Sequence, residues 1–512
     1  MATVAKPREV RLATLLAAMP GGQLLGPLPQ TVTGLTDDSR QVTAGSCFVA
    51  VRGLRADGHR FIPQAVERGA RAVVAEPPDP LPGEAVGRIL VPDTRRTLPR
   101  LADAYYGHPS RALTVVGITG TNGKTTTSYL CEALLRARGL ATGVIGTIQY
   151  VVGGQAREAG QTTPEAIELQ GLLAEMVAAG VGGVAMEVSS HALDLHRVDG
   201  VAFDVAVFTN LTQDHLDFHK TMEAYAAAKR RLFSELLLAG GKSGATAVLN
   251  ADDPVGAGWA ATLPGRLLTF GLGATHTIHP VQHESGQGGI RLVATSPSGP
   301  VHLVSPLIGE HNVMNLLGGV GVGVALGLAP SAIASALGSV TRVPGRFEQV
   351  DAGQGFLVVV DYAHTPDALQ RVLETARRLT SGRLAVVFGA GGDRDRGKRP
   401  VMGRIAATLA DRVWLTSDNP RSEDPVAILD EIAAGVVPVP RGGCARDPDR
   451  REAIRQALDW ARPGDTVVIA GKGHEPYQII GGQVLPFDDR LVAKEFLSGQ
   501  ASRGSGGAPC HA

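Results

Sequence analysis

Short apolar runs alternate with amphipathic stretches along most of the chain, and this alternation predicts an α/β protein built on parallel sheets. Residues 72–75 and 356–360 are apolar at every position, which is typical of strands buried on both faces. Residues 62–68, between the apolar residues 47–51 and 72–75, have helical periodicity. Further strands are predicted at residues 47–51, 182–186, 205–208, 245–249, 383–388, 412–416 and 466–470, and one opens at Val115.

Changes in this pattern divide the 512 residues into three predicted domains. We expect an N-terminal α/β domain over residues 1–109, a central parallel-sheet domain over 110–341 and a C-terminal Rossmann-like domain over 342–498. The length agrees with three domains at about 150 residues each. Residues 499–512 are rich in Gly and Ser, and this tail is predicted to be disordered.

Charge and cysteine usage narrow the class of protein. Lysine plus arginine equals aspartate plus glutamate, 49 against 49, so no basic field favours nucleic acid or an anionic membrane. The four cysteines form no Cys-x-x-Cys pair, which indicates a reducing cytoplasm. Residues 316–338 lack charge, but their glycines and Pro330 predict two helices in a soluble core. We expect a cytoplasmic monomer without membrane insertion or nucleic-acid partners.

A Gly-rich turn over residues 119–125 carries the clearest chemical signal. It follows a predicted strand and ends at a predicted helix start, one residue away from the strict phosphate-loop spacing. Gly120 and Gly123 let backbone N–H groups close around phosphate oxygens, Lys124 can reach the outer phosphates, and Thr125 can bind Mg²⁺. The turn therefore predicts a nucleotide-phosphate site in a phosphate-loop ATPase-like central domain; a turn without a ligand is the alternative.

Two neighbouring strands end in residues suited to a metal. Glu187 follows residues 182–186, while Asp214 and His215 follow residues 205–208. Because parallel strands present their carboxyl ends at one edge of the sheet, Glu187 could bind Mg²⁺ together with the phosphate-loop hydroxyl. Helix capping by such residues is the alternative.

Lys229 lies on the apolar face of a helix predicted over residues 222–238, with Tyr225, Leu232 and Leu236. Burial lowers the pKa of a lysine from its ordinary value of about 10.4, which makes the neutral amine available to take up CO₂. The resulting carbamate is an anion suited to Mg²⁺. A lysine that snorkels its amine to solvent is the alternative.

The turn over residues 119–125 resembles the phosphate loop of the Mur ligases and their folylpolyglutamate synthetase relatives, in which the same offset is usual. Matching motifs follow in order from Thr31 to Phe496. The resemblance implies catalytic roles for Lys124, Glu187, His215 and a carbamylated Lys229. It implies two Mg²⁺ sites served by Thr125, Glu187, His215 and Lys229. The implied ATP-binding residues are Gly120, Thr121, Asn122, Gly123, Lys124, Thr125, Thr126, His311, Asn312, Asn315, Arg346 and Asp361.

Residues 417–421, Ser-Asp-Asn-Pro-Arg, resemble the signature of the MurE-type branch of this family, which adds meso-diaminopimelate. That substrate has a second amino-acid centre, whose carboxylate suits a planar cation such as Arg421 and whose ammonium suits acidic or amide groups. The resemblance implies diaminopimelate binding by Arg394, Asp418, Asn419, Arg421, Gly471 and Glu475. An ordinary Asx-Pro turn is the alternative.

The same resemblance implies a site for the UDP-sugar peptide. Its implied residues are Ser39, Thr162, Thr163, Ser189 and Arg197. Leu195 stands where many relatives have a glutamine, so a contact through that side chain is left open.

The implied activity is that of an ATP-dependent acid–amino-acid ligase of peptidoglycan synthesis. It would join meso-diaminopimelate to the D-Glu γ-carboxylate of UDP-N-acetylmuramoyl-L-Ala-D-Glu through an acyl phosphate. The alternative is the same reaction with L-lysine or L-ornithine. A phosphate-loop NTPase that acts as a switch or motor is a more distant alternative, and it would hydrolyse nucleotide without a small-molecule acceptor.

Overall fold

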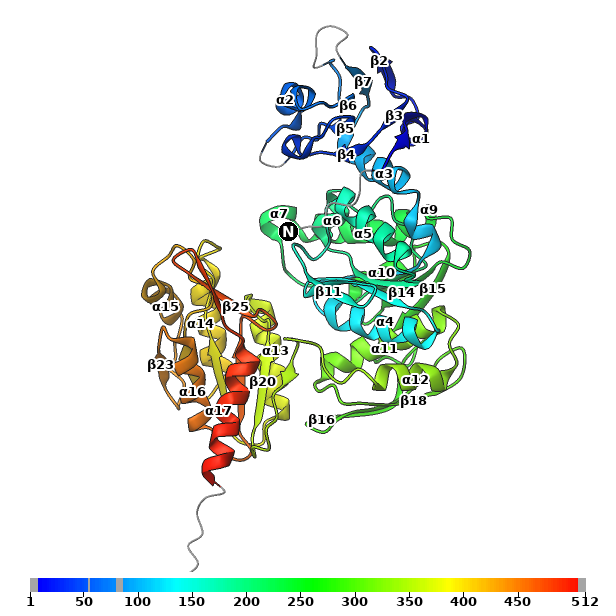
Figure 1. Ribbon diagram of the computed structural model, residues 1–512. Helices are drawn as coiled ribbons and strands as arrows, with labels where there is room; N and C mark the ends of the chain where they lie inside the picture. The colour runs from blue at the N-terminus through cyan, green and yellow to red at the C-terminus, as the bar shows by residue number, and fades with distance from the viewer. Residues whose placement is uncertain (1–7, 54–55, 80–85, 505–512) are drawn as a thin grey trace, which may run out of the picture. The chain divides into compact units, whose positions relative to one another are not determined.

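The computed structural model describes residues 8–53, 56–79 and 86–504. The chain divides into two compact units, one of residues 1–270 with 321–328 and the other of residues 271–320 with 329–512. A five-stranded and an eight-stranded sheet lie in the first unit, and a six-stranded sheet lies in the second (Figure 1). Each predicted domain contains one of these sheets, and the predicted α/β class is confirmed.

The N-terminal sheet is mostly parallel and has the order β2-β7-β6-β5-β4. Helix α2 packs on one face, where Ile62 joins the core of Phe48, whereas α3 packs on the other, where Leu101 joins the core of Val49. The bounds are α1 Leu12–Ala17, α2 Ile62–Glu67, α3 Thr94–Tyr106, β1 Val10–Arg11, β2 Gln23–Leu25, β3 Thr31–Val32, β4 Gly34–Thr36, β5 Ser46–Val49, β6 Ala72–Ala75 and β7 Gly87–Leu90.

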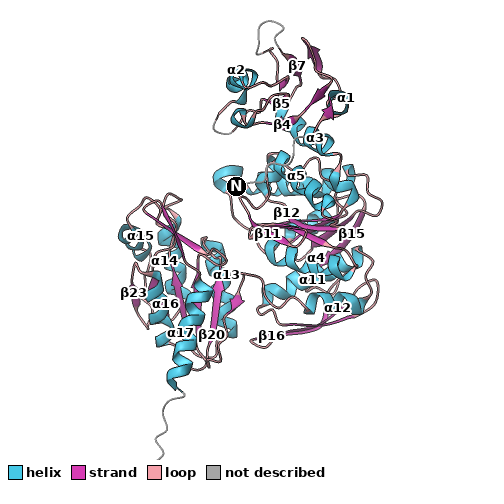
Figure 2. Cartoon of the chain, in the orientation of Figure 1, coloured by secondary structure: helices cyan, strands magenta, loops and turns pink. Residues whose placement is uncertain are grey.

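The central sheet places three chemically important strand ends side by side. Its order is β11-β10-β9-β12-β8-β13-β14-β15, so β8 lies between the parallel strands β12 and β13. Helices α4 and α5 cover opposite faces (Figure 2). The bounds are β8 Thr114–Thr119, β9 Thr142–Ile145, β10 Gln149–Val152, β11 Gln155–Glu158, β12 Gly183–Glu187, β13 Val205–Phe208, β14 Thr246–Asn250, β15 Arg266–Phe270, α4 Lys124–Ala137, α5 Ala166–Ala178, α6 Ser190–Asp194, α7 Leu216–His219 and α10 Pro254–Ala260.

The helix predicted over residues 222–238 has an interruption that the sequence pattern did not indicate. It consists of α8 Met222–Arg231, a π-helical turn Leu232–Leu236 and α9 Leu237–Ala239. Tyr225 and Lys229 nevertheless remain buried, as the apolar face predicted.

The second unit adds a small antiparallel sheet that was not predicted, formed by β16 Pro280–Gly286, β17 Gly289–Ala294 and β18 Val301–Ser305. Residues 316–338 do form two helical segments, since α11 Glu310–Ala325 ends before α12 Pro330–Gly338. Within the described part of the chain, no helix has both the length and the apolar character needed to cross a membrane.

The C-terminal sheet has the order β19-β20-β24-β21-β22-β23 and is buried on both faces. Val359 faces the core under α13, α14 and α15, whereas Val358 and Val360 face the core under α16 and α17, which explains the unbroken apolar runs. The bounds are β19 Glu348–Gln349, β20 Leu357–Asp361, β21 Leu384–Phe388, β22 Arg412–Leu415, β23 Cys444–Arg446, β24 Thr466–Ala470, β25 Tyr477–Ile480, β26 Gln483–Pro486, α13 Pro366–Leu379, α14 Lys398–Leu409, α15 Pro425–Ala433, α16 Arg450–Trp460 and α17 Asp489–Gly504.

The predicted tail lies only partly within the described residues. Helix α17 continues to Gly504, past the point where the sequence predicted disorder, and residues 505–512 lie outside the described part.

Candidate active site

The Gly-rich turn joins the end of β8 to the start of α4 and needs glycine for a steric reason. Gly120 has a φ of +148°, and a Cβ there would lie 1.9 Å from the Thr209 hydroxyl oxygen. Gly123 caps α4 in the left-handed region, with a φ of 84°. The segment after β13 braces the turn, since Thr121 N donates to Asn210 O at 2.8 Å. These contacts brace the turn at the N-terminus of α4, and helix N-termini favour anions.

Two lysine amines meet at one carbonyl of this turn. Lys124 Nζ donates to Gly120 O at 3.0 Å and to Thr121 O at 2.8 Å. Lys229 Nζ, from α8, donates to the same Gly120 O at 2.9 Å. The structure therefore brings the loop lysine and the helix lysine together, although they are far apart in the sequence.

The environment of Lys229 favours its neutral amine. Only 1% of the residue is exposed, and its Nζ lies 4.5 Å from the centre of the Tyr225 ring. Burial lowers the pKa of Lys229 well below its ordinary value, and the charge of Lys124 lowers it further, while Asp214 opposes both effects. A neutral primary amine is the form of lysine that reacts with CO₂.

Glu187 stands at the end of β12 and is 1% exposed. Thr147 holds both of its oxygens, because the backbone N–H donates to Oε1 at 2.9 Å and the hydroxyl donates to Oε2 at 3.0 Å. Thr125 and Glu187 line the same small recess. The buried hydroxyl and the buried carboxylate offer the oxygen ligands that Mg²⁺ prefers.

His215 lies just before α7 in the left-handed region, with a φ of 54°. Its side chain is 44% exposed, and its ring centre lies 4.7 Å from that of His191. Partial burial lowers the pKa of His215, the Asp214 charge opposes this, and the charges of His191, Lys124 and Lys229 add to the lowering. His215 therefore lies within electrostatic range of the two lysine amines.

Within the described residues, no three His, Cys, Asp or Glu side chains gather as a metal-binding group. A Mg²⁺ ion at this edge of the sheet would therefore draw on the Thr125 hydroxyl, phosphate oxygens or a carbamate as well as on Glu187 and His215.

The residues implied for the sugar peptide fall into one group with a single outlier. Thr163 Oγ1 accepts from Ser189 N at 3.0 Å, and one guanidinium nitrogen of Arg197 donates to Thr163 O at 3.2 Å. The Thr162 hydroxyl lies 3.1 Å from that of Thr147, which links this group to the carboxylate at the end of β12. Ser39 lies in the N-terminal sheet region and donates to Gln64 Oε1 at 2.7 Å.

The remaining nucleotide candidates lie mainly in the second unit. Asp361 Oδ2 accepts from Phe347 N at 2.7 Å, and burial raises the pKa of Asp361 while the Arg346 charge opposes the rise. Arg346 lies over the Tyr362 ring, 4.7 Å from its centre. The structure thus brings Arg346 and Asp361 together. The other three, His311, Asn312 and Asn315, lie in the first turns of α11, where Asn315 donates to Asn312 Oδ1 at 2.9 Å.

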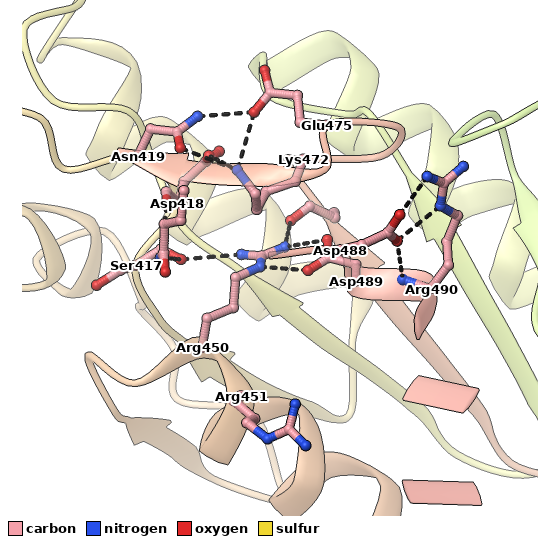
Figure 3. Close-up of polar contacts among 12 residues, drawn as sticks. Ser417, Asp418, Asn419, Arg450, Arg451, Lys472, Glu475, Asp488, Asp489 and Arg490 are labelled. Carbon is pink, nitrogen blue, oxygen red and sulfur yellow. Dashed lines mark hydrogen bonds and ion pairs between the residues drawn. The ribbon is translucent and has the colours of Figure 1, made fainter. Parts of the chain in front are cut away.

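The loops after β22 and β24 meet in a buried polar group (Figure 3). Asn419 Nδ2 donates to Glu475 Oε2 at 2.8 Å. Asp418 is 6% exposed, and a Cβ on Gly471 would lie 2.8 Å from its Oδ2. Four of the six predicted diaminopimelate residues, Asp418, Asn419, Gly471 and Glu475, therefore come together.

The two predicted arginines lie nearer to solvent. Arg421 adopts a φ of 54° and donates to Gly392 O at 2.8 Å, which turns its guanidinium toward the glycine loop after β21. Arg394 is exposed on that same loop and donates to Asp393 O at 3.0 Å. Both guanidinium groups are thus carried by one pair of adjoining loops.

The sequence analysis missed three residues that hold these groups. Lys472, in the same loop as Gly471, donates to Glu475 Oε2 at 3.0 Å and is fully buried. Arg450 forms a buried ion pair with Asp489 at 2.7 Å. A lysine between two predicted ligands was a visible signal for the first, whereas nothing in the sequence connects Arg450 with Asp489.

Three family models match the chain in succession. They are described as "Mur ligase family, catalytic domain" over residues 31–106, "Mur ligase middle domain" over 118–323 and "Mur ligase, glutamate ligase domain" over 345–473. The chain belongs to the Mur ligase family.

Curated relatives support the same assignment over the whole length. The UDP-N-acetylmuramoyl-L-alanyl-D-glutamate--2,6-diaminopimelate ligase of Geobacter metallireducens is 45% identical, over 97% of this chain and 100% of its own. The ligase of the same name from Gloeobacter violaceus is 50% identical, over 92% and 95%. A solved structure with this name has a TM-score of 0.67 at 35% identity and covers 92% of this chain and 96% of its own. At 22% identity, a MurF ligase from Thermotoga maritima in complex with ADP shares the fold, with a TM-score of 0.59 over 92% of this chain and 98% of its own.

Proposed function

We propose that this chain is an ATP-dependent ligase of peptidoglycan synthesis. It joins meso-diaminopimelate to the D-Glu γ-carboxylate of UDP-N-acetylmuramoyl-L-Ala-D-Glu. The observation that carries the proposal is the meeting of Lys124 and Lys229 at Gly120 O, beside the recess of Thr125 and Glu187. The names of the whole-length relatives support the choice of both substrates.

In this proposal the turn over residues 119–125 binds the ATP triphosphate. Lys124 would leave its own loop carbonyls for the outer phosphates, because phosphate oxygens are stronger acceptors for an ammonium. Thr125, Glu187, His215 and a carbamate on Lys229 would hold Mg²⁺, which neutralises phosphate charge when bound. His311, Asn312, Asn315, Arg346 and Asp361 are proposed to contact the rest of the nucleotide.

The reaction has two bond-forming steps. An oxygen of the D-Glu γ-carboxylate attacks the γ-phosphorus, ADP leaves, and an acyl phosphate remains. The neutral amine of diaminopimelate then attacks the acyl carbon, phosphate leaves, and the amide nitrogen gives up a proton. Lys124 stabilises charge on the transferred phosphoryl group, while Thr162, Thr163, Ser189 and Arg197 are proposed to hold the peptide.

The loops after β21, β22 and β24 supply the amino-acid specificity. Glu475 with Asn419 suits an ammonium, and Arg421 with Arg394 suits a carboxylate, so the pair matches a second amino-acid centre. L-Lysine has an ammonium at its far end but no carboxylate there, and it would leave the arginines unused. This difference favours diaminopimelate over lysine or ornithine.

The experiment is phosphate release with ATP and UDP-N-acetylmuramoyl-L-Ala-D-Glu, with meso-diaminopimelate, L-lysine and L-ornithine tested in parallel. We expect release with diaminopimelate alone among the three. Turnover with lysine or ornithine but not with diaminopimelate would overturn the specificity, and release without any acceptor would favour a switch or motor. We also propose that the protein is cytoplasmic and monomeric. Light scattering of the purified chain would test the monomeric state.

A further inference from the structure

The predicted diaminopimelate residues surround a lysine that no part of the proposed chemistry uses. Lys472 is fully buried, and its Nζ lies 3.0 Å from Glu475 Oε2, 3.1 Å from Asn419 Oδ1 and 3.8 Å from Asp418 Oδ1 (Figure 3). An ammonium has three donors and no acceptor. Two of the donors have hydrogen-bond acceptors in Glu475 Oε2 and Asn419 Oδ1, whereas Asp418 Oδ1 is an ion-pair partner at a longer distance. The centre of the Tyr477 ring lies 5.6 Å away.

Lys472 and the charged groups in direct contact with it carry one net negative charge. A further cation, Lys398, lies in electrostatic range of Asp418 and donates to His364 O at 2.9 Å. Asp418 and Glu475 carry two negative charges against the single positive charge of Lys472. The neighbouring Arg450 does not change this balance, because Asp489 pairs with it at 2.7 Å. Arg450 also donates to Ala470 O at 2.9 Å and to Ser417 O at 3.3 Å, so it ties together the ends of β22 and β24. The group therefore has an unneutralised carboxylate for a substrate ammonium, and Arg450 holds the ends of β22 and β24 together independently of Lys472.

Lys472 also fixes which atoms face a substrate. Asn419 Oδ1 accepts from Lys472 Nζ and from Ile479 N, at 3.1 and 3.0 Å, so the amide cannot turn over without losing both bonds. Its Nδ2 consequently donates to Glu475 Oε2, the oxygen that Lys472 also contacts. Among the described residues, none donates a hydrogen bond to Glu475 Oε1, which stays available as an acceptor.

We propose that Lys472 is a positioning residue for the amino-acid substrate. It holds the Asn419 amide and one Glu475 oxygen, so that the other Glu475 oxygen receives the ammonium of a second amino-acid centre. This inference rests on the proposed function, because it assigns the group to diaminopimelate. It adds a residue whose effect is on substrate affinity rather than on phosphoryl transfer.

The test compares Lys472→Met and Lys472→Gln with Lys494→Met, which removes an exposed lysine of α17. For both Lys472 variants we expect the KM for meso-diaminopimelate to rise about 30-fold or more, as for truncation of one partner of a buried charge pair. The KM values for ATP and for the UDP-sugar peptide should stay within about twofold, and Lys494→Met should match the wild type.

A double-mutant cycle with Glu475→Gln separates positioning from a general structural role. If Lys472 acts through Glu475, Lys472→Met should raise the KM far less in the Glu475→Gln background than alone. Effects that simply multiply would overturn the proposal. So would an unchanged KM, or loss of folding in both Lys472 variants as judged by thermal melting and binding of an ATP analogue.

The wild type distinguishes this inference from the proposed function. A wild-type enzyme that turns over meso-diaminopimelate while Lys472→Met keeps its KM would refute the positioning role alone. A wild type without any activity toward meso-diaminopimelate would refute the proposed substrate, and the positioning role with it.

Discussion

Lys229 and Lys472 are both almost completely buried, yet their surroundings differ in the way that decides their charge. Lys229 meets a backbone carbonyl, an aromatic ring and another lysine, and its pKa is lowered by burial and by Lys124. Lys472 meets an amide oxygen and two carboxylates. Burial alone therefore does not set the role of a lysine: the surroundings of Lys229 disfavour its charge, whereas those of Lys472 offer two carboxylates as partners.

The largest effect is expected when the Lys229 amine is removed. Lys229→Ala should lower kcat by about 10³-fold, as for loss of a group that stabilises transition-state charge. Short carboxylic acids in the assay should restore part of the activity by occupying the place of the carbamate. Phosphate release measures both effects, with the neighbouring Arg230→Ala as control. Full activity in Lys229→Ala would exclude the carbamate role.

The same substitution at the two lysines should have opposite effects on stability. Lys472→Met leaves Asp418 and Glu475 without their cation and should lower the free energy of unfolding by about 3 kcal/mol. Lys229→Met replaces a poorly solvated amine by an apolar group and should raise it by about 1 kcal/mol. Thermal and denaturant unfolding of the apo proteins test this pair, and two shifts of the same sign would contradict the comparison.

In the predicted diaminopimelate group, the planar shape of the Arg421 guanidinium can be tested separately from its charge. Arg421→Lys keeps the charge but loses the planar fork, so the KM for meso-diaminopimelate should rise about tenfold. The value of kcat at saturation should change little. Steady-state kinetics measure this, with the exposed Arg404→Lys on α14 as the matched control. An unchanged KM would remove Arg421 from the site.

The smallest expected effect is a dependence on pH. The pKa of Lys229 in the folded protein lies below its ordinary value of 10.5. At pH values between these two pKa values, this lysine is protonated more often in the unfolded chain than in the folded protein. Stability therefore rises with pH through that window. The advantage of Lys229→Met over the wild type should shrink as pH rises through that window toward 10.5. A pH-independent difference between the two melting curves would contradict a lowered pKa.

Much of the fold could be predicted from the sequence because it depends on local patterns of apolar residues. The apolar runs located the parallel strands, and their shared edge brought the turn over residues 119–125 beside Glu187. The antiparallel sheet β16–β18 was missed because a third of its positions are exposed and break up the apolar runs, as with Val281 at 69% and Val304 at 68% exposed. The partners of Lys472 were missed because Asn419 and Glu475 meet only when separate loops fold together.

The fold shows where the site residues lie, but their reactivity has to be measured. The central claim is that Lys229 is a neutral amine and Lys472 a cation, and labelled CO₂ tests it most directly. The protein is equilibrated with ¹³C-bicarbonate and observed by ¹³C NMR, with Lys229→Met and Lys472→Met in parallel. We predict one carbamate signal in the wild type and in Lys472→Met, and none in Lys229→Met. A wild type without the signal, or a signal that survives in Lys229→Met, would contradict the account.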